Sequence, residues 1–452
     1  MNQTSLSWIA LSEKFKDGLL PRRAAWDVLK AVSAGAFADI ALDRAINSNN
    51  LSEKDRRLLT ELAYGAIRSR ELLDTWIEFL GKIPSKKQPP LLRLILHLGL
   101  YQILFMEKIP SSAAVNTSVE LIKQTNLKKL TPVVNGILRS AVRAKNEGRE
   151  PQWPVKQTNR LAKIQSLPLW LAKDLVNWRG KEEAESIAKA SNRNPVIDLR
   201  VNRLISNPKS LQKIFSQKGI QSECIEDCPY GLQLLDGQGK ITMLPGFETG
   251  MWSVQDRSAQ WVANLLNPLP GSRILDACSA PGGKTTHLAE LMENHGTIWA
   301  VDRSNKRLQK VNKNAKRLGL KIIHTLTYDA SLLLNIKPKW LNYFDKILLD
   351  APCSGLGTLS RHPDARWRIN PTSIRQLVDI QANILDSLIP LLSANGSLLY
   401  STCTINPDEN TLQIKRFLKR NTSLSLENEK QIWPSCDKYG DGFYAALIKK
   451  NY

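Results

Sequence analysis

Two cysteines in the C-terminal part of the sequence stand in short motifs that directly follow apolar segments. Cys353 lies in the segment DAPCSG, and Cys403 lies in the segment YSTCT. An arbitrary free cysteine is usually a small buried hydrophobic residue. A cysteine at the end of a strand, beside a ligand cleft, is instead placed to add as a thiolate to an electron-poor ring. The residue types alone do not decide which of these two cysteines would attack.

Four aspartates follow four apolar segments that have the pattern of buried strands. They are Asp276, Asp302, Asp329 and Asp350. Each could be a helix cap or a turn residue if taken singly. In a parallel sheet, however, the carboxyl ends of the strands meet at one edge, where ligands bind. Four carboxylates at such an edge suit a neutral or cationic nucleoside cofactor better than a triphosphate, and S-adenosylmethionine, which carries a sulfonium, fits this description.

A glycine turn, DACSAPGGKT, begins at Asp276 and precedes a predicted helix. A phosphate-binding P-loop requires G-x4-G-K-[ST], and Cys278 stands where its first glycine should be. Pro281 also removes a backbone amide from the turn. Asp302 follows the glycines by about 20 residues, where a carboxylate can accept hydrogen bonds from both hydroxyls of a ribose. The turn therefore favours the nucleoside of a methyl donor over a nucleotide phosphate.

A methyl donor beside two cysteines suits the methylation of an electron-poor ring, of which cytosine is an example. Carbon 5 of cytosine is too weak a nucleophile to take a methyl group unaided. Addition of a thiolate at carbon 6 converts the ring into an enamine and thereby activates carbon 5. The adduct must then lose the proton on carbon 5 and eliminate the thiol.

The composition and charge of the chain narrow the classes of protein to which it can belong. Its 452 residues predict two to four domains at roughly 100–200 residues each. A content of 42% hydrophobic and 23% charged residues excludes a disordered, collagen-like or coiled-coil chain. The formal net charge of +21 indicates a polyanionic partner, most often nucleic acid and sometimes a membrane surface. Residues 303–321 contain eight basic residues and no acidic one, and their spacing predicts a helix whose basic flank faces either phosphate or solvent.

The sequence contains no segment that is expected to cross a membrane or to direct secretion. The longest apolar run, at 94–106, is interrupted by polar residues and too short for a bilayer, and the N-terminus lacks the pattern of a secretory signal. Six cysteines without a CxxC pair predict neither a disulfide scaffold nor a structural metal, and they favour a cytoplasmic location. These are Cys224, Cys228, Cys278, Cys353, Cys403 and Cys436. A monomer is expected, because the sequence predicts no long exposed apolar stripe that a partner chain would cover.

The first 250 residues have the pattern of a helical domain followed by a small α+β module. Residues 20–146 show helical spacing throughout, and Ser52 begins a capping pattern. A polar linker and further helical residues lead to 196–204, which alternate like a strand. A helix at 209–219 and short strands at 220–243 follow. Turns between these strands are predicted at three glycines, Gly231, Gly237 and Gly239.

From residue 251 the pattern changes to apolar strands that alternate with helices. Such a pattern predicts a parallel, doubly wound sheet. The strands are expected at 273–277, 297–301, 322–327, 346–349 and 396–401. The predicted fold is multidomain, with an all-α domain at 1–148, a small α+β module at 149–250 and a C-terminal α/β Rossmann-like domain at 251–452.

Four motifs, in this order, resemble those of the RNA cytosine-5 methyltransferase family: DACSAPGGKT, AVDRS, DAPCSGLGTLSRHPDARW and YSTCTINPDEN. The chain as a whole is similar to the bacterial RsmB branch of that family, whose members methylate cytosine in 16S (small-subunit) ribosomal RNA. PRRAAWDVL and PVVNGILRSAVR resemble the NusB-like RNA-binding domain at the front of that branch. DLRVNRL and GMWSVQDRSAQ resemble its small ferredoxin- or RRM-like subdomain.

The resemblance implies roles for individual residues. It gives Cys403 as the nucleophile and Cys353 as the cysteine that assists release of the methylated product. It also implies that Asp350 hydrogen-bonds the target base, with Lys284 close enough to assist. The implied cofactor is S-adenosylmethionine, held by Cys278, Ser279, Ala280, Pro281, Gly282, Gly283, Lys284, Asp302, Asp329 and Asp350.

The implied partner is 16S ribosomal RNA, free or in early assembly, held by the NusB-like domain and the basic segment 303–321. His362, Arg366 and Trp367 are expected to shape the RNA-facing rim, with a buried tryptophan or a salt bridge at the rim as the alternatives. Two alternatives stay open: the same chemistry on transfer RNA, and a non-catalytic assembly or antitermination factor that binds the cofactor without reaction. The pair of cysteines argues against the second alternative, because a binding protein needs neither thiol.

Overall fold

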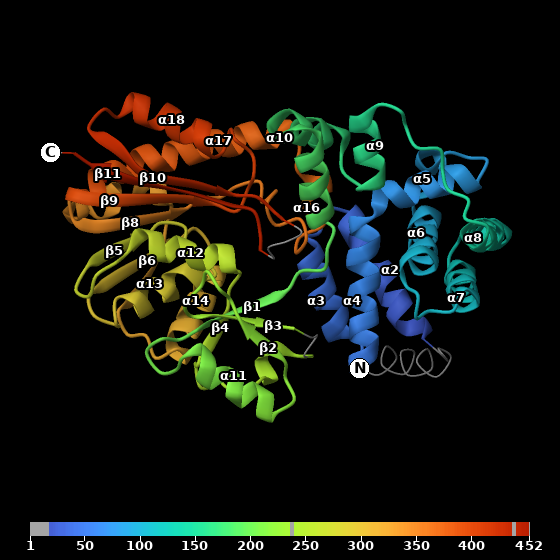
Figure 1. The fold of residues 1–452 in the computed structure, drawn as a ribbon, viewed down its shortest axis with the longest axis horizontal. Helices are drawn as coiled ribbons and strands as arrows, with labels where there is room; N and C mark the ends of the chain where they lie inside the picture. The colour runs from blue at the N-terminus through green and yellow to red at the C-terminus, as the bar shows by residue number, and fades with distance from the viewer. Residues whose placement is uncertain (1–17, 236–238, 436–439, 452) are drawn as a thin grey trace, which may run out of the picture. The chain divides into compact units, whose positions relative to one another are not determined.

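The computed structural model describes residues 18–235, 239–435 and 440–451, which fold into two compact units (Figure 1). The first unit contains the chain up to Asn192 together with the short segment His362–Arg368, and the rest of the chain forms the second unit. None of the described helices is both long and apolar enough to cross a membrane. The turn predicted at Gly237 and the cysteine at position 436 lie outside the described residues.

The first unit is built from helices, as the spacing of its apolar residues predicts. Their buried faces form one continuous core, in which Leu59, Leu62 and Ile95 are fully buried. The helices are α2 (Leu19–Ser33), α3 (Ala38–Ser48), α4 (Glu53–Arg68), α5 (Arg70–Leu80), η1 (Ser85–Lys87), α6 (Pro90–Phe105), α7 (Ser111–Lys123), η2 (Lys128–Leu130), α8 (Thr131–Asn146), α9 (Gln157–Ile164), α10 (Leu169–Ala190) and α16 (Ala365–Arg368).

Local sequence signals set the ends of several of these helices. The Ser52 hydroxyl accepts a hydrogen bond from the Asp55 amide, which confirms the predicted cap at the start of α4. Pro90 stands in the first turn of α6, where the missing amide would have had no intrahelical partner. α10 is kinked at Gly180, whose φ of 76° lies in the left-handed region that favours glycine.

The second unit begins with a small antiparallel sheet of order β2-β3-β1-β4, called here the small sheet. Leu199, Phe215 and Trp252 are fully buried in its core. β1 is shorter than the strand predicted at 196–204, because the chain turns after Asn202, whose carbonyl accepts hydrogen bonds from the amides of Ile205 and Ser206. The elements are β1 (Ile197–Val201), α11 (Pro208–Gln217), β2 (Ser222–Cys224), β3 (Gly231–Leu234), η3 (Ile241–Met243) and β4 (Trp252–Val254).

The remainder of the second unit forms a large sheet of order β10-β11-β9-β8-β5-β6-β7. Strands β9, β8, β5, β6 and β7 pair in parallel, and β11 and β10 are added antiparallel. The strands are β5 (Arg273–Asp276), β6 (Thr297–Asp302), β7 (Ile323–Thr327), β8 (Phe344–Asp350), β9 (Leu392–Thr402), β10 (Leu424–Ile432) and β11 (Phe443–Lys450).

Helices cover both faces of the large sheet (Figure 1). Ile274 and Leu348 pack under α12, α13 and α14, whereas their neighbours Leu275 and Leu349 pack under α17 and α18. Burial on both faces explains why these strands are continuously apolar. The covering elements are α12 (Arg257–Leu266), α13 (Gly283–Leu291), α14 (Asn305–Arg317), η4 (Ala330–Leu332), α15 (Leu333–Ile336), η5 (Pro338–Trp340), α17 (Pro371–Leu388), η6 (Ile389–Leu391) and α18 (Thr411–Arg420).

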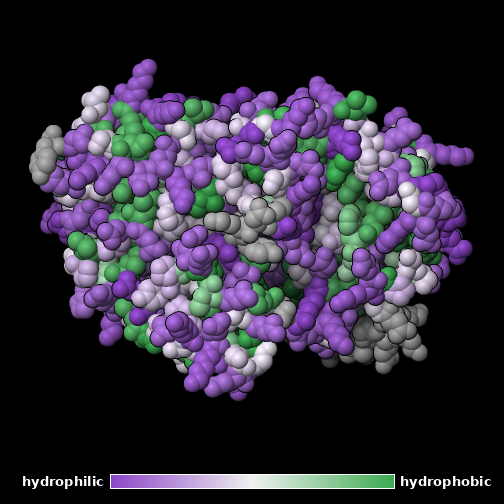
Figure 2. Space-filling model, in the orientation of Figure 1, coloured by the Kyte–Doolittle hydropathy of each residue, from purple (hydrophilic) through white to green (hydrophobic). Residues whose placement is uncertain are grey.

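The predicted fold class is confirmed in all three parts: a helical front, a small α+β module and a doubly wound C-terminal sheet. β8 and β9 are longer than the strands predicted at 346–349 and 396–401, because ladder pairing continues beyond their apolar centres. β10 and β11 are missing from the prediction. β10 is polar and mostly exposed, so no apolar pattern marks it. Figure 2 shows hydrophilic residues over most of the visible face, with apolar residues scattered among them.

Arg366 is fully buried in the first unit, to which the segment His362–Arg368 belongs. Its guanidinium donates hydrogen bonds to the backbone carbonyls of Arg68, Ser166 and Ser191, at 3.2, 3.1 and 3.0 Å. These carbonyls stand at the C-terminal ends of α4, α9 and α10, where helix dipoles concentrate partial negative charge. Burial, together with the charge of Arg68, lowers the pKa of Arg366 to about 9.

Trp367, the next residue in the chain, adds a further contact to this packing. The Trp367 indole nitrogen donates to the Ile67 carbonyl at 2.7 Å, and the Arg68 carbonyl next to it accepts from Arg366. Trp367 is partly buried, whereas Arg366 is fully buried, a placement that was not predicted from the sequence. His362 is exposed.

Replacing Arg366 by methionine is expected to lower the free energy of unfolding by about 3 kcal/mol, because three buried carbonyls lose their donor. Urea unfolding followed by far-UV circular dichroism measures the change. Arg139→Met, at an exposed position of α8, removes the same charge and should alter stability by less than about 0.5 kcal/mol. Equal stability of the two variants would show that the buried guanidinium does not hold the helix ends together.

Candidate active site

The carboxyl ends of the parallel strands gather the predicted acidic residues at one edge of the large sheet. Asp350, Asp276 and Asp302 are the last residues of the neighbouring strands β8, β5 and β6, and Asp329 follows β7. Helix α13, which follows β5, brings Lys284 to the same edge, where it contacts Asp350. The four aspartates that were predicted to share one edge of the sheet therefore lie at that edge.

The pairing of β8 with β9 brings the two predicted cysteines together. Asp350 lies opposite Ser401, and the Ala351 amide donates to the Ser401 carbonyl at 2.8 Å. The loops that follow these strands carry Cys353 and Cys403, whose sulfur atoms are 3.5 Å apart. Contact with Cys403, reinforced by burial, raises the pKa of Cys353 well above its usual value. Cys353 therefore keeps its proton at neutral pH.

Lys284 and Asp350 form an ion pair beside these cysteines. The Lys284 Nζ is 2.7 Å from one oxygen of Asp350, and the Ser401 hydroxyl donates to the other at 3.0 Å. Burial disfavours the charged form of Lys284, but attraction to Asp350 and Cys403 outweighs it and raises the lysine pKa. The site thus holds a fixed positive charge next to Cys403.

Hydrogen bonds join the glycine turn to the end of β6. Both the amide and the hydroxyl of Ser279 donate to the Val301 carbonyl, at 2.9 and 3.1 Å. Gly282 has a φ of 102°, and a Cβ there would lie 3.1 Å from the Cα of Val311 in α14. Only glycine lets the turn pack this closely against α14. Ala280 accepts a hydrogen bond from Arg307, Pro281 is exposed, and Gly283 begins α13.

Asp302 and Asp329 each accept hydrogen bonds within the turn that follows their strand. Asp302 accepts a hydrogen bond from the Ser304 amide at 2.9 Å. Asp329 caps η4 by accepting from the amide and hydroxyl of Ser331, at 2.9 and 2.7 Å. The second oxygen of each carboxylate faces an exposed arginine, Arg307 at 3.3 Å and Arg303 at 3.5 Å. These oxygens are the ones oriented away from the local turns.

Asp276 is fully buried at the start of the turn, and Cys278 is partly buried. The Thr285 hydroxyl donates to one oxygen of Asp276 at 2.6 Å, and the other oxygen has no hydrogen-bond partner among the described residues. Burial raises the pKa of Asp276 to about 7. Burial and the neighbouring carboxylates also raise the pKa of Cys278, which keeps it a neutral thiol. Cys278 is therefore unsuited to act as a thiolate nucleophile.

Arg200, on β1 of the small sheet, holds the first turn of α13 and was not expected from the sequence to do so. It is buried and forms two hydrogen bonds to Glu290, at 3.0 and 2.7 Å. It also donates to the Gly283 carbonyl at 2.7 Å and to the Thr286 hydroxyl at 3.0 Å. The small sheet thereby fixes the helix that carries Lys284. The available signal was an arginine between two apolar residues, Leu199 and Val201, of the predicted strand.

Polar residues that follow Cys403 hold its loop in place, and this role was likewise not predicted from the sequence. Asn410 accepts from the Thr402 hydroxyl at 2.6 Å and donates to the Thr404 carbonyl at 3.0 Å, so it braces the chain on both sides of Cys403. Glu409 is fully buried and accepts hydrogen bonds from residues adjacent to both cysteines. The signal was the segment NPDEN, whose polar side chains closely follow the YSTCT motif.

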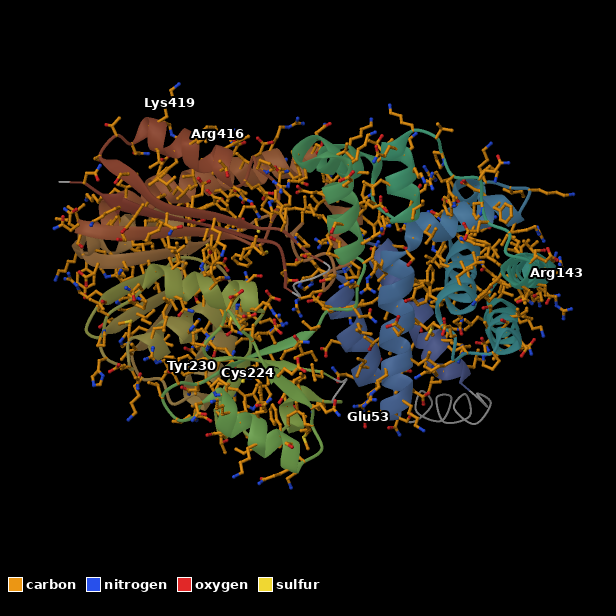
Figure 3. The ribbon with its side chains drawn as sticks, in the orientation of Figure 1. Glu53, Arg143, Cys224, Tyr230, Arg416 and Lys419 are labelled. Atoms are coloured by element: carbon orange, nitrogen blue, oxygen red, sulfur yellow. The ribbon has the colours of Figure 1, made fainter. Side chains whose placement is uncertain are left out.

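The basic segment 303–321 forms the predicted helix, α14, and its flanks, and Leu308, Val311 and Leu318 lie on its buried side. Part of its charge is used internally, because Arg317 donates to the carbonyls of Phe247 and Trp252 at 2.7 and 2.9 Å. Its exposed lysines are Lys306, Lys310, Lys313, Lys316 and Lys321. Further basic side chains project from α8 and α18 in Figure 3, namely Arg143, Arg416 and Lys419.

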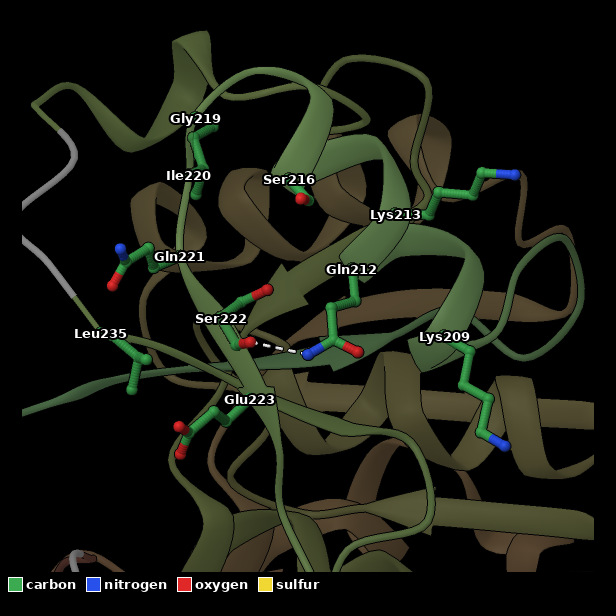
Figure 4. Close-up of a pocket in the computed structure, with 10 residues that line it drawn as sticks. All are labelled: Lys209, Gln212, Lys213, Ser216, Gly219, Ile220, Gln221, Ser222, Glu223 and Leu235. Atoms are coloured by element: carbon green, nitrogen blue, oxygen red, sulfur yellow. Dashed lines mark hydrogen bonds between the residues drawn. The ribbon is translucent and has the colours of Figure 1, made fainter.

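A separate hollow on the second unit lies against α11 and β2 (Figure 4). Lys209 and Lys213 project from α11 beside it, and the Gln212 amide donates to the Ser222 carbonyl at 2.7 Å. It contains none of the predicted site residues. Within the described ranges, no group of three or more histidine, cysteine, aspartate or glutamate side chains is placed to hold a metal ion.

In a comparison with known proteins, each of the three parts of the chain matches a family model. Residues 263–449 match the family "16S rRNA methyltransferase RsmB/F", residues 20–143 match the NusB family, and residues 167–240 match the RsmF/B-like ferredoxin-like domain. The crystal structure of a protein named PH0851 superimposes with a TM-score of 0.81 at 27% identity, covering 97% of this chain and 100% of that one.

Two curated relatives are similar over nearly their whole length. A Synechocystis protein named "Probable ribosomal RNA small subunit methyltransferase B" is 45% identical, over 95% of this chain and 99% of its own. An Escherichia coli protein named "Ribosomal RNA small subunit methyltransferase B" is 37% identical, over 88% of this chain and 92% of its own. Because the similarity covers nearly the whole of both chains and the family models match all three parts of the fold, the chain belongs to the RsmB/F family of 16S rRNA methyltransferases.

Proposed function

We propose that this chain transfers a methyl group from S-adenosylmethionine to carbon 5 of one cytosine in 16S ribosomal RNA, through a covalent bond between Cys403 and carbon 6 of the base. The observation that carries the proposal is the 3.5 Å separation of the Cys353 and Cys403 sulfurs next to the ion pair of Lys284 and Asp350. The reaction needs one group to attack the ring and another to help the product leave. Two thiols in contact can divide these tasks.

The charges at the site support Cys403 as the nucleophile and Cys353 as the residue that assists release. The ammonium of Lys284 interacts electrostatically with Cys403, so the proposed nucleophile lies beside a positive charge. Contact with Cys403 and burial raise the pKa of Cys353, so its thiol stays protonated and suits an acid–base role.

The proposed reaction balances its bonds and protons as follows. The Cys403 thiolate forms a bond to carbon 6, and a proton taken up at ring nitrogen 3 leaves an enamine that is nucleophilic at carbon 5. Asp350 is proposed to hydrogen-bond the base during this step. After carbon 5 is methylated, the proton on nitrogen 3 is given back, and carbon 5 then loses its own proton. The electrons of that carbon–hydrogen bond re-form the double bond between carbons 5 and 6 while the carbon–sulfur bond breaks and its electron pair returns to Cys403.

The residues at the strand edge fit the proposed cofactor. A set of carboxylates, with one buried Asp276 oxygen lacking a partner, suits hydroxyl and cationic groups and would repel a triphosphate. Asp302 would accept hydrogen bonds from the ribose hydroxyls, and the close-packed turn at Gly282 would line the nucleoside. The full proposed set is Cys278, Ser279, Ala280, Pro281, Gly282, Gly283, Lys284, Asp302, Asp329 and Asp350. When bound, S-adenosylmethionine supplies an electrophilic methyl group.

The proposed substrate is 16S ribosomal RNA, free or in early assembly, and the names of the relatives support the choice of ribosomal RNA. The exposed lysines of α14 and the basic side chains of α8 and α18 provide positive charge for contact with phosphates. A cytosine in a loop or single strand would enter the site by base flipping. We assign RNA binding to the parts at 1–148 and 149–250 and methyl transfer to 251–452, in a chain that acts as a monomer.

Cys403→Ala is expected to lower the methylation rate by about 10³-fold or more, because no other residue replaces the attacking thiolate. Transfer of labelled methyl groups to unmodified 16S RNA measures the rate, and nucleoside mass spectrometry identifies the product as 5-methylcytidine. Cys224→Ala removes an exposed cysteine on β2 and should leave the rate unchanged.

Two results of this assay would contradict the proposal. Undiminished transfer by the Cys403→Ala variant would exclude the covalent mechanism. Methylation of transfer RNA in place of 16S RNA would change the substrate, and RNA binding without methylation of either would indicate a non-catalytic factor.

Cys353→Ala is expected to stop the reaction after attack, because the adduct with Cys403 forms but is not released. A protein–RNA band should then persist on a denaturing gel after incubation with 16S RNA and S-adenosylmethionine. The band should disappear in the Cys353→Ala/Cys403→Ala double variant. Absence of the band from Cys353→Ala, with normal methylation by the unmodified protein, would mean that the two roles are assigned wrongly.

Asp302→Ala is expected to weaken S-adenosylmethionine binding by roughly 10–100-fold, the effect of losing charge-assisted hydrogen bonds worth about 1.5–3 kcal/mol. Isothermal titration calorimetry gives the dissociation constant directly. Asp379→Ala, at an exposed position of α17, serves as the matched control and should bind normally. Normal binding by the Asp302→Ala protein would remove this carboxylate from the cofactor site.

A further inference from the structure

Glu409 is a fully buried carboxylate for which the proposed reaction gives no role. It lies between the end of β9 and the start of α18, shortly after Cys403. Its oxygens accept hydrogen bonds from the loops of both cysteines, which come from segments far apart in the sequence. A buried charge is retained only with such partners, so these contacts determine where the two loops can lie.

The contacts to the Cys353 loop are the shortest. The Ser354 amide donates to one oxygen of Glu409 at 2.8 Å, and the Ser354 hydroxyl donates to the other at 2.5 Å. Gln381 of α17 bridges the same carboxylate, at 3.1 Å, and the Pro352 carbonyl, at 3.0 Å. Glu409 therefore holds the residue after Cys353 directly and the residue before it through Gln381.

The contact to the Cys403 loop passes through the residue that follows that cysteine. The Thr404 hydroxyl is 3.3 Å from Glu409 and 2.7 Å from the Ser354 hydroxyl. Each hydroxyl has one proton: Ser354 donates its proton to Glu409, and Thr404 shares its proton between the Ser354 oxygen and Glu409. The residues after the two cysteines are thus joined to each other and to one carboxylate.

The two loops depend on Glu409 to different degrees. The Cys403 loop is independently braced by Asn410, which binds Thr402 and Thr404, and it continues directly from β9. The Cys353 loop has its amide at Ser354 satisfied by Glu409 itself. Burial raises the pKa of Glu409, and the hydrogen bonds donated by Ser354 act against that rise. Loss of the Glu409 carboxylate would therefore free chiefly the loop of Cys353, while the loop of Cys403 would stay in place.

We propose that Glu409 is a positioning residue that holds Cys353 in contact with Cys403 and thereby controls release of the methylated base. The effect on release rests on the proposed function, whereas the effect on the separation of the two thiols does not. The two effects can therefore be tested separately, in the full-length protein.

The separation of the thiols can be measured by how readily they form a disulfide. Diamide, a thiol oxidant, takes up the two hydrogens of the thiols and is reduced to a hydrazine while the sulfur–sulfur bond forms. Trypsin places Cys353 in the peptide 347–361 and Cys403 in the peptide 376–415, so mass spectrometry quantifies the linked pair. Glu409→Gln should slow this reaction about 10-fold or more, because loss of close placement costs orders of magnitude in rate.

The adjacent carboxylate gives a matched control. Asp408 is exposed, so Asp408→Asn should form the disulfide at the rate of the unmodified protein. Ser354→Ala keeps the carboxylate but removes one hydroxyl contact, and it should slow the reaction by less than Glu409→Gln. An unchanged rate in Glu409→Gln would overturn the proposed positioning role, whether or not the protein is an RNA methyltransferase.

The effect on release is read from the RNA adduct, with Cys353→Ala as the reference. Glu409→Gln should retain a protein–RNA band that depends on Cys403, as Cys353→Ala does, while general loss of structure would remove both band and methylation. If Cys353→Ala retains the band and Glu409→Gln turns over normally, control of release is disproved. If Cys353→Ala itself forms no band but the disulfide rate falls in Glu409→Gln, the proposed function fails and the positioning role stands.

Discussion

The candidate site depends on one backbone constraint, the parallel register of β8 against β9. Main-chain hydrogen bonds set Asp350 opposite Ser401, so the two strands end together and the loops after them begin side by side. Cys353 and Cys403 come within 3.5 Å because each lies in the loop that begins at the end of its strand. A slip of one residue would turn Asp350 to the other face of the sheet and separate it from Lys284. Side chains add to this arrangement but do not create it.

Buried charges then fix the loops that the register brings together. Lys284 is paired with Asp350, Arg200 is paired with Glu290, and Glu409 is surrounded by donors from the cysteine loops. Each charge would be costly to bury alone, so each pair permits few alternative positions of the segments that carry it. The consequence is a pair of thiols held at a fixed separation before any substrate arrives, which is the condition for effective proximity catalysis.

The general layout was predictable from the sequence, because it follows from local pattern and one rule of parallel sheets. Apolar strands followed by aspartate or cysteine must place those residues at one edge, and the acids and both cysteines are found there. The role of Glu409 was not predictable, since its main partner, Ser354, lies 55 residues away along the chain. Arg366 likewise depends on helix ends of the first unit, which no local pattern identifies. Long-range contacts of polar side chains therefore account for most of what the sequence left open.

The central claim, that Cys403 attacks the base with Cys353 beside it, is most directly tested by finding which cysteine carries the RNA. In RNA containing 5-fluorocytosine the proton on carbon 5 is replaced by fluorine, which cannot leave as a cation, so the adduct stays trapped on the unmodified protein. After nuclease and trypsin digestion, mass spectrometry should find the nucleotide on the peptide 376–415, which contains Cys403. A nucleotide on the peptide 347–361, which contains Cys353, or no adduct on either peptide, would contradict the account.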